Sequence, residues 1–175
     1  MGLMGRSQPF VAQALDAGFV FKTGWQRQDP AIRADALEMW GRLGLLPPRA
    51  NPQRRADEIV AAAYLGDELA AVGTAYMSQV TLLRRRFAVW RVSVAPAYRR
   101  HHLMFALGGY SRDILESWSR EHPELNIAGM ATITSFQALS ETKLPAVLPG
   151  SELRLIGYTP DGNRIRVAWF DHTRV

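Results

Sequence analysis

Four basic or titratable side chains follow one another near the middle of the chain: Arg99, Arg100, His101 and His102. They come after an apolar run that Pro96 stops, and helix-forming residues begin at Leu103. This pattern predicts a strand, a basic turn and a helix over residues 87–107. The first N–H groups of a helix are unpaired and lie at the positive end of its dipole. Such a turn therefore favours binding of a phosphate or pyrophosphate.

The elements around this turn predict a mixed sheet. Residues 59–64, 69–77 and 87–94 are apolar runs separated by short turns, which indicates three consecutive antiparallel strands. A helix over residues 103–121 leads to a further apolar strand at residues 125–132. A strand, a crossover helix and a strand form a parallel unit, so the sheet is predicted to be antiparallel first and parallel at its middle.

The N-terminal third predicts mainly helix. A short helix over residues 9–17 and a short strand over residues 19–21 come first. A second helix is marked by Asp29, followed by a proline, and ends at Gly44. Residues 49–57 are polar and interrupted by proline, which predicts a loop.

The C-terminal end predicts a β-hairpin. Residues 153–158 and 164–170 flank a Pro-Asp-Gly turn, and Ile165 and Val167 alternate with the arginines at 164 and 166. An exposed edge strand in this hairpin would favour a homodimer.

Length and composition indicate one globular domain spanning residues 1–175. The chain has 175 residues, 47% of them hydrophobic, which is enough to bury a sizeable core. It has no cysteine, so disulfides and thiolate metal sites are excluded, and the histidine spacing predicts no metal site. Neither a signal peptide nor an apolar run long enough to span a membrane is evident, and we expect a cytoplasmic protein without a membrane partner.

The charge favours a small anionic ligand. The net charge is +5 and the isoelectric point about 10.1, but the basic residues are nearly all arginines spread along the chain. The sequence has no basic platform interleaved with aromatic residues and no recognition motif, which argues against nucleic acid. An anionic small molecule is the better match for this charge.

Residues Val94 to Leu107, VAPAYRRHHLMFAL, together with the order of elements around them, resemble the GNAT superfamily of acyl-CoA-dependent N-acyltransferases. The resemblance covers about residues 19–170. It implies an α+β fold, an α/β three-layer arrangement with a central mixed β-sheet flanked by helices. It also implies transfer of an acetyl or other acyl group from acetyl-CoA, or another acyl-CoA, to an amine by direct attack, with no metal. The acceptor would be a small-molecule or peptide amine.

The resemblance also implies where the coenzyme binds. Arg99 matches the first position of the family's pyrophosphate motif, whereas His102 and Met104 stand where small residues are usual. The expected coenzyme-binding residues comprise the backbone that pairs with the pantetheine arm and the turn that holds the pyrophosphate: Val92, Val94, Arg99, Arg100, His101, His102, Leu103 and Met104. A widened gap between the strand of residues 87–94 and the strand near residues 131–132 would admit the arm.

The catalytic residue is left open by the sequence. Many family members use a tyrosine after the fifth strand as the general acid, but residues 132–150 contain no tyrosine. The candidates are Ser135 and Glu141, and also Tyr158 if the terminal hairpin closes the site. Ser135 has an ordinary structural explanation as a helix cap, and Glu141 has one as an exposed helical residue. Because of this and the two unusual motif residues, an alternative is a catalytically inactive GNAT-like module that binds acyl-CoA or another anion.

Overall fold

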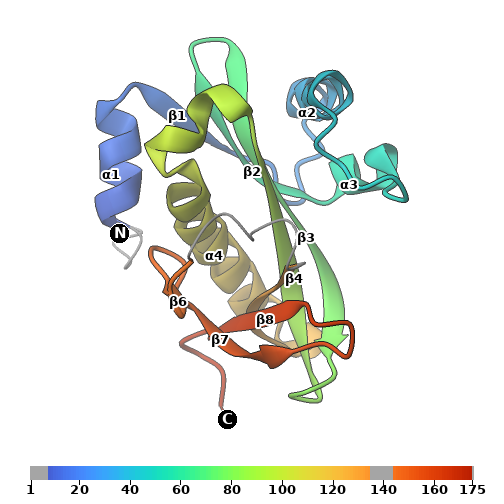
Figure 1. Cartoon of the computed structure of the whole chain (residues 1–175). Coiled ribbons are helices and arrows are strands. Elements are labelled where there is room, and N and C mark those ends of the chain that lie inside the picture. Colours follow the sequence, from blue (N-terminus) through green and yellow to red (C-terminus); the bar gives the residue numbers. More distant parts are fainter. Residues whose placement is uncertain (1–7, 135–143, 175) are drawn as a thin grey trace.

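The computed structural model describes residues 8–134 and 144–174. Within them, eight strands form one sheet. Their bounds are β1 Phe19–Thr23, β2 Ile59–Leu65, β3 Glu68–Val80, β4 Arg85–Val94, β5 Ile127–Thr134, β6 Val147–Leu148, β7 Leu153–Tyr158 and β8 Arg164–Trp169. The strand order across the sheet is β1-β2-β3-β4-β5-β8-β7-β6 (Figure 1).

The pairing of the strands confirms the predicted mixed sheet. β1 to β4 form an antiparallel meander, β4 and β5 pair in parallel, and β5, β8, β7 and β6 are again antiparallel. The parallel step needs a crossover, and helix α4 (Leu103–Glu121) supplies it. The C-terminal hairpin of β7 and β8 also forms, but β8 inserts beside β5 rather than lying at an edge.

Helices cover both faces of the sheet, giving the predicted three layers (Figure 1). The helices α1 (Gln8–Asp16) and α4 pack on one face, and α2 (Pro30–Leu43) and α3 (Pro52–Asp57) pack on the other. Two 3-10 helices, η1 (Pro96–His101) and η2 (Pro123–Leu125), flank α4. No helix in the described residues combines the length and the apolar character needed to cross a membrane.

Two local predictions were wrong. Residues 49–57 were predicted to be a loop but contain α3, because Asn51 caps the helix through a 3.0 Å hydrogen bond from the Arg54 N–H and a proline occupies the first turn. Arg84-Arg85-Arg86 lies between two predicted strands, and such a run of charges indicates a solvated turn. The turn ends at Arg84, and the next two arginines begin β4.

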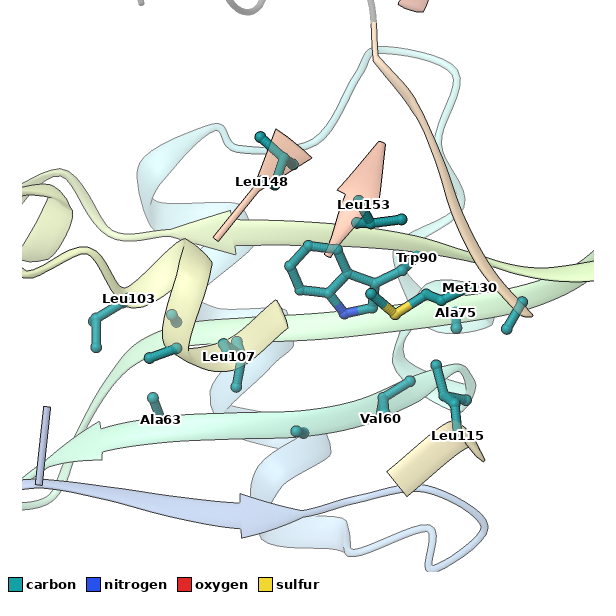
Figure 2. Close-up of a cluster of buried hydrophobic side chains, with 14 of the residues drawn as sticks. Val60, Ala63, Ala75, Trp90, Leu103, Leu107, Leu115, Met130, Leu148 and Leu153 are labelled. Atoms are coloured by element: carbon teal, nitrogen blue, oxygen red, sulfur yellow. The ribbon is translucent and has the colours of Figure 1, made fainter. Parts of the chain in front are cut away.

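The core between α4 and the sheet is built around Trp90. Its side chain is 3% exposed and lies among Leu107, Met130 and Leu153 (Figure 2). Two glycines make room for the indole. A Cβ atom on Gly73 would lie 2.7 Å from the Trp90 Nε1, and one on Gly108 would lie 3.3 Å from its Cη2. The ring thus fixes the distance between α4 and β3.

We predict opposite effects for two glycine-to-alanine substitutions. In Gly129→Ala the new Cβ would lie 2.2 Å from the backbone oxygen of Ala168 on β8, so we expect the free energy of unfolding to fall by about 3 kcal/mol. In Gly41→Ala nothing lies within 4 Å of the new Cβ, and alanine favours a helix more than glycine does. We therefore expect the free energy of unfolding to rise by about 1 kcal/mol. Urea unfolding measures both. Equal stability of the two variants would contradict the close approach of β5 and β8.

Candidate functional site

The strands β4 and β5 diverge within the sheet. Their register runs through Ala88 with Met130 and ends at Val89 with Ala131, yet β4 continues to Val94. β5 also continues, paired only with β8. We call the point where this pairing ends the fork. Beyond it, the β4 edge that faces β5 has no strand partner among the described residues. Its backbone groups are available to an extended ligand.

The helix that follows β4 begins without a side-chain cap. Its N-cap is His102, which makes no capping hydrogen bond, and the helix is 19 residues long. The N–H groups of the first turn therefore lack a side-chain acceptor while lying at the positive end of the dipole. This is the anion-favouring helix start that the sequence predicts.

His102 adopts a backbone conformation that suits glycine. Its φ and ψ are 53° and 26°, in the left-handed region. The resemblance expects a small residue at this position, and the structure gives the physical reason, since glycine adopts positive φ without a steric cost. His102 therefore holds the backbone conformation that a glycine would adopt here, but with strain in its backbone.

The structure brings the four basic or titratable side chains of residues 99–102 to one end of α4. Arg99 and Arg100 are exposed on η1 and form none of the ion pairs found in the described part of the chain. The ring of His101 packs on Phe19, with centroids 5.2 Å apart. The ring of His102 stacks on Phe105 at 6.0 Å. The arginines are thus free to meet an anion, whereas the imidazoles are partly held by aromatic neighbours.

The four other residues predicted to bind the coenzyme have buried or half-buried side chains. Leu103 is fully buried, so it offers only its backbone N–H, and Met104 is half-buried. Val92 and Val94 are half-buried and pack against the core on the α4 side of the sheet. All four lie close to the fork or to the start of α4.

The predicted catalytic candidates are not brought together by the described part of the chain. Ser135 and Glu141 lie outside the described residues. Tyr158 is 59% exposed at the end of β7, and β8 separates it from β5. A role for any of the three stays a prediction.

One buried cation was missed by sequence reasoning. Arg166 alternates with Ile165 and Val167 as an outward residue would, but it is 2% exposed because its face of β8, shared with Ala168, packs into the core on the α4 side of the sheet. Burial lowers the pKa of its guanidinium, and the charge of Arg164 lowers it further. Arg166 lies opposite Thr132 on β5. Its Nε and the Thr132 Oγ1 are both buried without a hydrogen-bond partner among the described residues. The burial of Arg166 depends on which elements cover its face of the sheet, which the neighbouring sequence does not indicate.

Comparison with solved structures finds distant similarities in fold. A GNAT-family acetyltransferase from Streptococcus pneumoniae is 11% identical, with 87% of this chain and 99% of that chain covered at a TM-score of 0.49. Ard1 from Thermoplasma volcanium is 9% identical, with 87% and 96% covered at a TM-score of 0.44. No family model and no curated protein matches the sequence. We therefore base the functional proposal on the residues of this chain.

We predict that glycine is preferred over alanine at position 102. Both His102→Gly and His102→Ala remove the ring contacts, but only glycine relieves the left-handed backbone. His102→Gly should therefore be more stable than His102→Ala by about 1 kcal/mol. Chemical denaturation of the two variants measures the difference. A more stable alanine variant would show that the residue does not hold a positive φ.

Proposed function

We propose that this protein is an acyl-CoA-dependent N-acyltransferase that transfers an acetyl or other acyl group to an amine. The observation that carries the proposal is the adjacency of two features. β4 loses β5 as a partner on one edge at the fork, and the same strand leads through η1 into the uncapped, arginine-flanked start of α4. An extended arm ending in a pyrophosphate matches this pair of features.

The residues present are suited to hold coenzyme A. The pyrophosphate would bind the N–H groups at the start of α4, with Arg99 and Arg100 adding charge-assisted hydrogen bonds. The pantetheine arm would run along the unpaired edge of β4 at Val92 and Val94. The arm replaces the missing strand, so the backbone of β4 regains hydrogen-bond partners.

The chemistry follows from an activated thioester held at the fork. A neutral amine nitrogen attacks the thioester carbon, the carbon–sulfur bond breaks, and the thiolate leaves with the electron pair. The amine must lose a proton to a base or to water, and the thiolate must gain one. A backbone N–H on the free edge of β4 would stabilise negative charge on the carbonyl oxygen. Ser135, Glu141 and Tyr158 remain candidates for proton transfer.

A second candidate function is a module that binds acyl-CoA without catalysis. His102 and Met104 favour it, because side chains at these positions reduce the space close to the backbone cradle. The acceptor would be a small-molecule or peptide amine if the protein is an enzyme.

A homodimer also remains a prediction. β6 spans only Val147–Leu148, so β7 has a free edge beyond Leu155 among the described residues.

We predict that coenzyme A binds at the basic end of α4. The double variant Arg99→Gln/Arg100→Gln should bind coenzyme A at least about tenfold more weakly than the wild type in calorimetric titration, because two charge-assisted contacts are lost. Arg84→Gln is the matched control, since Arg84 is equally exposed but lies before the opposite end of β4. Its affinity should equal that of the wild type.

Turnover separates the two candidate functions. Acetyl-CoA incubated with a panel of amines should release free thiol, which a thiol reagent detects. Binding of coenzyme A with no thiol release across the panel would favour the non-catalytic module. No binding of coenzyme A at millimolar concentration would remove both functions.

A further inference from the structure

A group of charged side chains lies on the sheet face opposite α4. We call Arg55, Arg91 and Glu58 the arginine cluster. Arg91 points from β4 to this face because its neighbour Trp90 points to the α4 side, and Arg55 comes from α3. Arg91 forms an ion pair with Glu58. The side chain of Arg91 is 31% exposed, so a ligand can reach it.

Several hydrogen-bond donors around this cluster have no acceptor within the described part of the chain. There, the Nε atoms of Arg55 and Arg91 are buried without a partner, and so is the Oγ1 of Thr74, which is 1% exposed and directly opposite Arg91 on β3. The indole N–H of Trp40, whose ring lies against Arg55, is also unpaired. Buried donors without acceptors are costly. The complementary group is one with acceptors only, such as a carboxylate or a phosphate.

The cluster also carries excess positive charge. Glu58 is shared between Arg91 and Arg54, whose Nε lies 3.6 Å from its carboxylate. Burial and the charge of Arg91 lower the pKa of Arg55 to about 10, while Glu58 raises it less than these two factors lower it. Glu58 alone therefore does not balance the two arginines, and a further anion would be stabilised between them.

Aromatic rings hold both guanidinium groups. The Arg91 Cζ lies 4.6 Å from the ring centroid of Tyr76, and the Arg55 Cζ lies 5.8 Å from that of Trp40. Stacking fixes the plane of a guanidinium while leaving its N–H edge available. Such preorganised arginines lose little entropy when they bind a planar carboxylate in a bidentate manner.

Arg91, the member of the arginine cluster on β4, lies next to the fork, and its side chain reaches across β3 to Glu58, which precedes β2. The last pair between β4 and β5 is Val89 with Ala131, and Arg91 is two residues further along β4. The start of α4, where the coenzyme would bind, is on the other face. A thioester held at the fork would thus have the coenzyme on one face of the sheet and the arginine cluster on the other.

We propose that Arg91 and Arg55 bind an oxyanion of the acceptor, so that the acceptor is a small amine that also carries a carboxylate or a phosphate. This inference rests on the proposed function, because it takes the acylated amine to sit at the fork. It narrows the acceptor from any amine to an anionic one. The cluster would hold the anionic end while the amine reaches the thioester.

Matched ligands test this inference. Wild-type protein saturated with coenzyme A is titrated by calorimetry with amines that differ only in the anionic group. One series contains α-amino acids and 4-aminobutyrate with their carboxamides, and the other contains O-phosphoethanolamine with ethanolamine. We expect at least one acid to bind about tenfold more tightly than its neutral partner. The series that shows the preference identifies the oxyanion as a carboxylate or a phosphate.

Variants link the preference to the cluster. Arg91→Gln and Arg55→Gln should each lose the preference for the anionic ligand, and Arg91→Lys should keep part of it because the charge remains without the bidentate fork. Arg54→Gln is the matched control. Arg54 also contacts Glu58, but its side chain is 79% exposed, and the variant should keep the full preference. All variants should bind coenzyme A as the wild type does, which also shows that they are folded.

The outcomes separate this inference from the proposed function. Binding of coenzyme A with equal affinity for acids and their neutral partners overturns the inference and leaves the proposed function intact. Absence of coenzyme A binding overturns the proposed function. A preference for acids that survives in both Arg91→Gln and Arg55→Gln would place the anion site elsewhere and also overturn the inference.

Discussion

The parallel pairing of β4 and β5, and its end after Val89, is the constraint on which the rest of the structure depends. That parallel step requires the crossover that α4 supplies, and only η1 separates the end of β4 from the N-terminus of this helix. Trp90, the first residue beyond the fork, fills the space between the sheet and α4 (Figure 2). The same arrangement that makes the core thus also leaves a strand edge free beside a helix start.

Much of the fold could be predicted because its signals are local. Asp29 accepts hydrogen bonds from the first N–H groups of α2, and Gly44 ends that helix with a left-handed backbone, as expected from the sequence. The bounds of α4 and the hairpin at Pro-Asp-Gly follow from equally short patterns. The helix α3 was missed because Asn51 and the next proline suit both a loop and a helix start, and six helical residues show no clear period.

In the candidate site, too, the residues that could be predicted are those whose signals are local in the sequence. The basic turn at residues 99–102 lies in one continuous stretch, so its chemistry could be predicted from neighbours in sequence. The burial of Arg166 and the meeting of Arg55 with Arg91 could not, because they depend on which strands and helices lie side by side. An arginine in an alternating strand pattern is expected to face solvent. It becomes buried only where other elements cover its face of the sheet.

In the proposed complex, part of the positive charge that gives the chain its net charge of +5 binds two separate anions. Arg99 and Arg100 stand at the start of α4, on one face of the sheet, and Arg55 and Arg91 stand on the other face near the fork. In the proposed complex each pair meets a different anion, the pyrophosphate of the coenzyme and the oxyanion of the acceptor. Two anions of like charge repel each other, and holding them on opposite faces of the sheet reduces that repulsion while their neutral reacting ends meet between them. Positive charge placed in this way favours two small anionic ligands over a continuous phosphate backbone, which would need its cations along one surface.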